Sequence, residues 1–185
     1  MDGYVRSDVL KDLYDYDNSE FVNNLEMEGF FVAQQSHSNY AKTILSVPST
    51  LNMDYVDTFA PGLDDSKFWW LMEPFIDHSE VRTLLKSQGY QTVSFSTNWS
   101  LTDMNSADIH LAAFPVELTD FEQYLLQTTP LRLSQPFLQD SASVFTSETQ
   151  RRTILHTLGA LDDFVSDPDP VFVFAHILLP HPPFV

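Results

Sequence analysis

The sequence contains no cysteine and few basic residues. The lack of cysteine excludes disulfide bonds, thiolate zinc sites and a cysteine nucleophile. Only 9 Lys and Arg stand against 26 Asp and Glu, so the formal charge is −17, and such a surface repels the phosphates of nucleic acid. No apolar run is long enough to cross a bilayer, and the charged start has no apolar segment after it, as a signal peptide would. We therefore expect a soluble acidic fragment that does not bind nucleic acid.

Apolar residues are nevertheless plentiful. They make up 43% of the chain and include 15 Phe, which is enough for a packed core. The length of 185 residues fits one domain. The chain starts directly at Met1-Asp2-Gly3 and stops soon after an apolar run, at Val185. We expect a single α/β domain over residues 1–185 that is truncated at both ends.

Helix-type and strand-type patterns alternate along the chain. Gly29 and Gly89 are placed to end helices, Ser147 with Gln150 predicts a capping box, and Pro48 predicts a kink or a first turn. Residues 171–179 are nearly all apolar, as in a central strand buried on both faces. The predicted helices are 18–29 (capped by Asn18 or Ser19), one within 41–53, 64–75, 78–88, 118–126 and 147–165. The predicted strands are 30–33, 90–96, 108–114 and 171–179, and the predicted loops include 34–40 and 128–143. This order predicts a mostly parallel sheet with helices on both faces.

Three residues could carry chemistry beyond the carboxyl ends of such strands, where ligands of α/β folds bind. Asp2 could ligate a cation, Thr43 could be a nucleophile at a helix start, and His181 follows the last strand between two prolines. Each also has an ordinary structural interpretation. Asp2 before Gly suits a turn, Thr43 suits a helix cap, and His181 suits an exposed loop. His176, inside the apolar run, is expected to be a hydrogen-bonded core residue rather than a ligand.

Taken together, these segments resemble the alkaline phosphatase/sulfatase superfamily. Residues 2–6, Asp-Gly-Tyr-Val-Arg, resemble the Asp-Gly-aromatic-x-Arg opening of its phosphodiesterases, in which the Asp binds metal. Lys42-Thr43 stands where those enzymes have a Lys-Thr nucleophile. Residues 172–184, which include Pro180-His181-Pro182-Pro183-Phe184, resemble the His-x-Pro-Phe segment of sulfatases and lipoteichoic-acid-synthase-like enzymes, whose His contacts the substrate anion. The resemblance is strongest over residues 2–53 and 171–184.

The position of the nucleophile has two alternatives. Ser46-Val47-Pro48 resembles the Ser-Val-Pro of phosphoethanolamine transferases, whose nucleophilic Thr lies shortly upstream, and this agrees with Thr43. Residues 46–50 also resemble the sulfatase signature Cys/Ser-x-Pro-x-Arg, and this alignment would make Ser46 the nucleophile. Thr50 replaces the Arg of that signature, and no cysteine is available as formylglycine precursor. We therefore prefer Thr43.

The resemblance implies a metal-dependent phosphoryl transferase or hydrolase with a Thr43 nucleophile. Asp2 and Thr43 would hold a divalent cation (Zn, Mn or Mg), and His181 and Lys42 would bind a small-molecule or lipid substrate that contains phosphate. Two protein ligands are few for a metal, so we expect weak metal binding and little or no activity from this fragment. Relatives of this kind often follow transmembrane helices, which implies an extracytoplasmic domain of a membrane-anchored protein.

Two rival interpretations remain open at the level of sequence. The chain could be a non-catalytic binding domain that keeps the fold of this superfamily and has lost its chemistry. It could also be an unrelated acidic α/β domain in which Asp2, Thr43 and His181 lie far apart.

Overall fold

The computed structural model describes residues 4–63, 69–138, 142, 146–164 and 169–179. The contacts within the chain gather it into two compact units, one of them Gly3–Ser38 and the other containing Asn39–Val185. That residues 1–185 form one domain stays a prediction.

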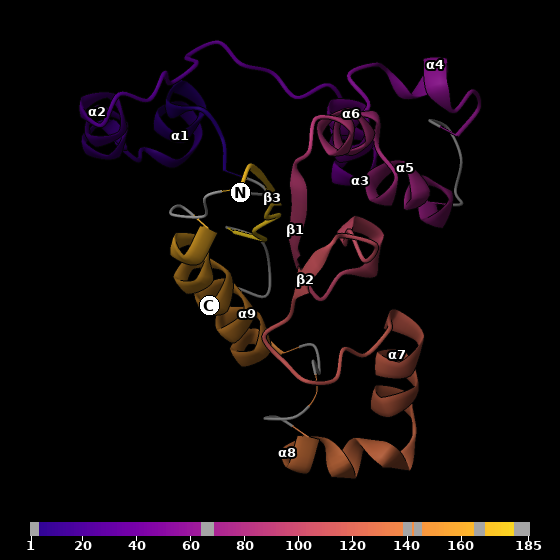
Figure 1. The fold of residues 1–185 in the computed structure, drawn as a ribbon. Coiled ribbons are helices and arrows are strands. Elements are labelled where there is room, and N and C mark those ends of the chain that lie inside the picture. Colours follow the sequence, from indigo (N-terminus) through magenta and orange to yellow (C-terminus); the bar gives the residue numbers. More distant parts are fainter. Residues whose placement is uncertain (1–3, 64–68, 139–141, 143–145, 165–168, 180–185) are drawn as a thin grey trace. The chain divides into compact units, whose positions relative to one another are not determined.

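The larger unit contains a small parallel sheet (Figure 1). Strand β1 (Gln91–Phe95) lies between β2 (Ile109–Leu111) and β3 (Val171–Phe174). Val93 pairs with Ile109 and Val173, and the next residue, Ser94, pairs with the next residue of each neighbour, so the three strands run in the same direction. The chain is therefore a mixed α/β protein with a three-stranded parallel sheet, as the alternating patterns predict.

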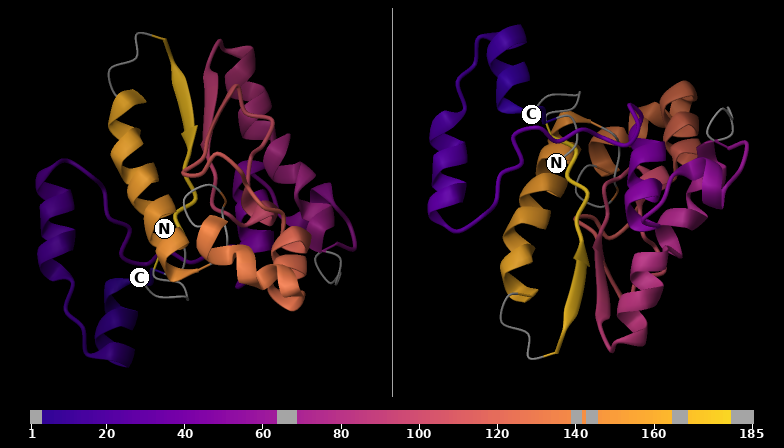
Figure 2. Two further views of the ribbon diagram at one scale, coloured as in Figure 1. Left: turned by 90° about the horizontal axis from the view of Figure 1, so that it is seen from below. Right: turned by 90° about the horizontal axis from the view of Figure 1, so that it is seen from above.

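Different elements pack against the two faces of this sheet (Figure 2). On one face the Phe95 ring meets His156 of α9 (Ser147–Ala160) and Phe164 of η4 (Leu161–Phe164), edge to face. On the other face Phe172 and Phe174 pack against a core cluster. That cluster is formed by Leu51 of α3 (Thr43–Leu51), Ile76 of α5 (Pro74–Asp77) and Met104. Side chains alternate along a strand, so neighbouring positions anchor the sheet to opposite layers.

The remaining elements of the described residues are mostly short. The smaller unit contains α1 (Ser7–Tyr14) and α2 (Ser19–Met27). The larger unit also contains α4 (Val56–Phe59), η1 (Trp69–Met72), α6 (Glu80–Ser87), η2 (Ser100–Thr102), α7 (Asp120–Thr128), η3 (Pro130–Ser134) and α8 (Gln135–Leu138). The predicted helices at 18–29, 41–53, 78–88 and 147–165 and the strands at 90–96 and 108–114 are confirmed with shorter bounds. The helix predicted at 118–126 is confirmed with its bounds shifted by two residues, at α7. Gly29 and Gly89 follow helices with φ of 90° and 87°, the left-handed backbone that favours glycine.

Several local predictions are wrong. Residues 30–33 form no strand, and Phe31 is 92% exposed, because an apolar run needs a neighbouring strand to pair with. The predicted helix 64–75 is replaced, in its described part, by η1 and the start of α5. The predicted loop 128–143 contains η3 and α8, since Pro130 and Pro136 fit the first turn of a helix, where an amide hydrogen is not needed.

The predicted central strand 171–179 is also wrong in two respects. It ends at Phe174, and it has β1 on one side and no described strand on the other. Its residues are only half-buried, whereas β1 buries four of its five residues. The central strand of the described sheet is therefore β1.

Helix α9 buries a different face from the one its apolar residues predict. Leu155 and Leu158 are 51% and 49% exposed. The buried face instead consists of Thr149, Gln150, Thr153, Ile154 and Thr157. The helix cap also lies one residue earlier than predicted, because the Thr146 hydroxyl accepts a hydrogen bond from the Thr149 amide. A polar helix face of this kind needs polar partners, and the ends of the strands provide them.

Candidate functional site

The carboxyl ends of β1 and β3 carry a group of buried polar side chains. Strand β1 ends at Phe95 and β3 at Phe174, and parallel pairing brings both ends to one edge of the sheet. Ligands of α/β sheets bind beyond this edge, so we take it as a candidate site. Its buried polar residues include Ser96, Thr97, Thr102, Asp103, Gln150, Thr153 and Thr157.

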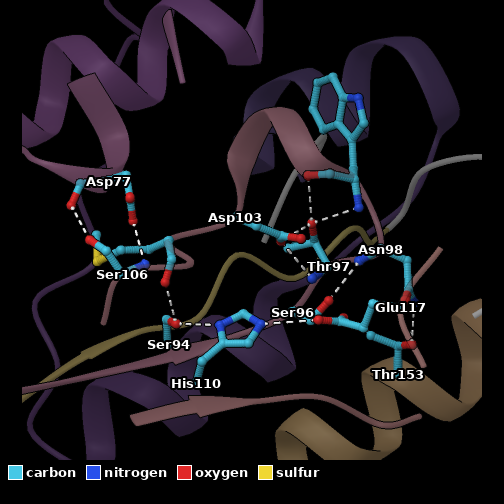
Figure 3. A network of polar contacts seen from close by, with 12 residues as sticks. Asp77, Ser94, Ser96, Thr97, Asn98, Asp103, Ser106, His110, Glu117 and Thr153 are labelled. Atoms are coloured by element: carbon cyan, nitrogen blue, oxygen red, sulfur yellow. Dashed lines mark hydrogen bonds and ion pairs between the residues drawn. The ribbon is translucent and has the colours of Figure 1, made fainter. Parts of the chain in front are cut away.

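Asp103 is a buried carboxylate at this edge of the sheet, and its pKa differs strongly from that of a carboxylate in water. Its Oδ1 accepts hydrogen bonds from the amide and the hydroxyl of Thr97, at 2.9 and 2.7 Å, and the residue is 7% exposed (Figure 3). Burial raises the pKa of Asp103 to about 6, and the nearby charge of Glu117 adds to this effect, while the two hydrogen bonds oppose it. A carboxyl group with such a pKa can exchange a proton near neutral pH.

His110 links a buried serine to a second carboxylate (Figure 3). Its Nδ1 lies 2.8 Å from Ser94 Oγ, and its Nε2 lies 3.2 Å from Glu117 Oε2. Ser94 Oγ donates its own hydrogen to the Met104 carbonyl at 2.7 Å. His110 Nδ1 must therefore donate to Ser94, while Nε2 donates to Glu117, so both ring nitrogens carry a proton.

The pKa values at this pair agree with the hydrogen bonds. The hydrogen bond to Glu117 raises the pKa of His110 and outweighs the effect of burial. Burial pushes the pKa of Glu117 upward, but hydrogen bonds from His110 and Ser96 lower it overall.

The order Ser94–His110–Glu117 is superficially that of a serine hydrolase relay. Ser94 is 0% exposed, and its hydrogen points to the Met104 carbonyl rather than to the imidazole. A nucleophilic serine needs the reverse, with its hydroxyl donating to the base and accessible to substrate. The group is therefore a charged structural link between β1, β2 and the chain that follows β2.

A third set of contacts ties the edge of the sheet to α9. Asn98 has a left-handed backbone with φ of 60°, and its Nδ2 donates to the Thr153 hydroxyl at 2.5 Å (Figure 3). His176 lies just beyond β3, and its Nδ1 is 3.0 Å from the Thr102 hydroxyl. His176 is half-buried and hydrogen-bonded, as predicted. The loop after β1 is thus fixed to both neighbouring segments.

The predicted nucleophile lies at the start of α3. Thr43 is the first helical residue and is half-buried, and Lys42 precedes it as an exposed N-cap residue with extended backbone. The Lys42 side chain makes no capping hydrogen bond to this helix start. Ser46, the competing nucleophile, lies inside the helix, where its carbonyl accepts from the Thr50 hydroxyl at 2.9 Å. Thr43 therefore has the position that an anion at a helix N-terminus would approach.

Asp2 and His181 lie outside the described residues, so the structure does not test whether they meet Thr43 and Lys42. Among the residues that are described, no three His, Asp or Glu side chains gather as ligands for a metal ion. The convergence of these predicted site residues stays a prediction.

The residues at the edge of the sheet were not predicted from sequence. Ser94 and Asp103 look like ordinary polar residues of a strand and a loop. Only the parallel register of β1 and β2 reveals that Ser94 faces His110. A weak signal existed, since a serine between Val93 and Phe95 is unusual for a strand with both faces buried.

Comparison with family models, with curated proteins and with solved structures finds no match to this chain. In the part of the chain that the structure describes, no helix has the length and apolar character needed to cross a membrane.

Proposed function

We propose that this chain belongs to a metal-dependent enzyme of the alkaline phosphatase superfamily that transfers or hydrolyses phosphoryl groups through Thr43. The observation that carries the proposal is the position of Thr43 at the first residue of α3, directly after the exposed Lys42. The partial positive charge of a helix start and the Lys42 ammonium would both favour a phosphate group at the Thr43 hydroxyl. This position agrees with the Lys-Thr motif of the phosphodiesterases that the sequence resembles.

The reaction would proceed in two displacements. Thr43 Oγ1 forms a bond to phosphorus while the bond from phosphorus to the ester oxygen breaks, and the proton of Thr43 leaves with the departing alcohol. Water or an acceptor alcohol then attacks the phosphorus of phospho-Thr43, which releases the Thr43 hydroxyl. Lys42 and His181 would hold the negatively charged oxygens of the substrate.

Asp2 and Thr43 would hold a divalent cation, Zn, Mn or Mg. Such a cation lowers the pKa of a bound hydroxyl and neutralises negative charge on phosphoryl oxygens. These two residues supply only two donors, fewer than the four or more that these metals take. We therefore expect weak metal binding and low activity from this chain.

The substrate class follows from the same resemblance. It would be a small molecule or a lipid with a phosphate ester, acted on by an extracytoplasmic domain of a membrane-anchored protein. The parallel sheet would then be part of an incomplete alkaline-phosphatase-like domain with helices on both faces.

A second candidate is a binding domain of the same fold without catalysis. The observation that favours it is the lack of a three-residue metal-ligand cluster among the described residues. Such a domain could still bind phosphate esters at the start of α3.

Substitution of the nucleophile separates the two candidates. Turnover of an aryl phosphodiester and an aryl phosphomonoester is measured with Zn, Mn and Mg, for the longest form of the protein that carries this sequence. Thr43→Ala should abolish turnover, because it removes the attacking hydroxyl, and Thr43→Ser should retain part of it, because it keeps one. Ser46→Ala is the matched control and should leave turnover nearly unchanged.

The phosphorylated intermediate gives an independent readout. Mass spectrometry after acid quenching should find phosphate on Thr43 in the unsubstituted protein. Turnover that survives in Thr43→Ala, or its loss in Ser46→Ala alone, contradicts the assignment of the nucleophile. Saturable binding of the esters without turnover under any metal favours the binding domain.

A further inference from the structure

Gln150 of α9 has one half of its amide satisfied and the other half without a partner. Its side-chain Nε2 donates to the Leu178 carbonyl at 3.0 Å, which ties α9 to the chain after β3. Its Oε1 is buried and has no hydrogen-bond partner among the described residues. The whole residue is 5% exposed, so bulk solvent does not supply the missing hydrogen bond. Buried acceptors are rarely left unpaired in folded proteins.

Gln150 lines a small cavity at the carboxyl ends of β1 and β3. Most of its other lining side chains carry hydroxyl or imidazole groups, and they include Ser96, Thr97, Thr153, Thr157 and His176. The cavity leaves about 10 Å³ for the centre of a water-sized molecule. That is about the space that one buried water needs, and too little for a small organic ligand.

We propose that this cavity is a binding site for one water molecule that donates a hydrogen bond to Gln150 Oε1. Its second hydrogen can reach one of the lining hydroxyl oxygens, since an oxygen that already accepts one bond keeps a second lone pair. Ser96 Oγ in the loop after β1, for example, accepts from the Asn98 amide and can accept once more. The water would join α9 to the loop after β1, as Gln150 itself joins α9 to the chain after β3.

A cation is the competing occupant. A divalent ion would need carboxylate or imidazole ligands, and no cluster of three such groups exists in the described part of the chain. Amide and hydroxyl oxygens, such as those around the cavity, also bind monovalent ions. No carboxylate of a described residue lines the cavity to balance the charge of a cation, which favours a neutral water molecule, and the experiment separates the two.

Magnetic relaxation dispersion of water oxygen-17 counts buried water molecules with long residence times. The unsubstituted protein should show one more such molecule than Gln150→Met, which keeps the length of the side chain and removes its acceptor. Gln123→Met is the matched control, because Gln123 is a glutamine of α7, 5% exposed, whose Nε2 donates to the Leu118 carbonyl. The control should keep the full count. An equal count for the unsubstituted protein and Gln150→Met overturns the proposal.

A second measurement needs no substitution, in case Gln150→Met does not fold. A crystal structure should show a water oxygen within about 3.2 Å of Gln150 Oε1. No water at that position overturns the proposal. The melting temperature is also compared in potassium chloride and in tetramethylammonium chloride at equal ionic strength. A saturable rise in potassium alone would mean that the site takes a cation, and would overturn the assignment to water.

Discussion

Replacing Asp103 by Asn should stabilise the protein at neutral pH and leave it unchanged in acid. Asp103 uses one carboxylate oxygen, Oδ1, to accept both hydrogen bonds from Thr97. The amide oxygen of Asn can accept the same two bonds. Asn carries no charge, so the substitution removes the free-energy cost of burying an ionised group and keeps the turn after β1.

The size of the effect follows from the pKa of Asp103. Folding raises this pKa from its ordinary value of 3.8 to about 6. This difference of about 2 pKa units corresponds to about 3 kcal/mol, at about 1.4 kcal/mol for each unit. Because the pKa of Asp103 is higher in the folded state, its contribution to the free energy of unfolding is fully present below pH 3.8, where the group is protonated in both states. This contribution is lost as the pH rises through 6, where the buried group must ionise. The Asn side chain does not titrate and suffers no such loss.

Urea denaturation of both proteins between pH 4 and pH 8 measures the difference. The free energy of unfolding of Asp103→Asn, minus that of the unsubstituted protein, should grow by up to about 3 kcal/mol across this range. Taking the difference cancels the titration of the other acidic groups. A difference that stays constant with pH, or one that falls as the pH rises, would refute the reasoning about burial.

Two further predictions concern His110 and Thr119. Glu117→Gln should lower the pKa of His110, because the hydrogen bond to Glu117 is the main cause of its rise. The protonated His110 stabilises the fold below about pH 6.5, the ordinary pKa of the imidazole, and this stabilisation is lost as the pH rises through the raised pKa of the folded state. In Glu117→Gln the folded-state pKa is lower, so the stabilisation should be lost at a lower pH. A titration of the imidazole followed by NMR measures this, and an unchanged midpoint contradicts it. Thr119→Ala removes the hydroxyl that accepts from the Glu122 amide and keeps the backbone amide that donates to the Glu122 carboxylate, and it should cost about 1 kcal/mol in urea denaturation. Thr119→Ser should cost clearly less, and equal losses would mean that the hydroxyl does not act as a cap.

The sequence predicts the positions of most helices because their signals are local. Gly29 and Gly89 end helices, and the apolar spacing within 78–88 and 118–126 is read without knowledge of distant residues. Local signals failed where a partner was needed. The run 30–33 has strand-like composition and no strand beside it among the described residues of its unit.

The polar edge of the sheet could not be predicted for the same reason. Ser94 and His110 are separated by 16 residues and meet only through the parallel register of two strands. Asn98 and Thr153 are 55 residues apart in the chain. Of the site predicted from the resemblance, the structure describes Thr43 and Lys42 at a helix start, where the sequence had placed them.

The polar inner face of α9 has a consequence for how this helix is held. Apolar contacts tolerate small rotations and slides, because they lack direction, whereas hydrogen bonds to Asn98 and Leu178 have a required angle and length. The hydrogen-bond donors and acceptors that α9 meets therefore fix how the helix is rotated about its own axis. Its undocking would uncover mostly polar groups of the helix, and exposure of polar surface lowers the heat capacity of unfolding whereas exposure of apolar surface raises it. Docking of α9 therefore specifies an orientation more than it supplies a large hydrophobic driving force.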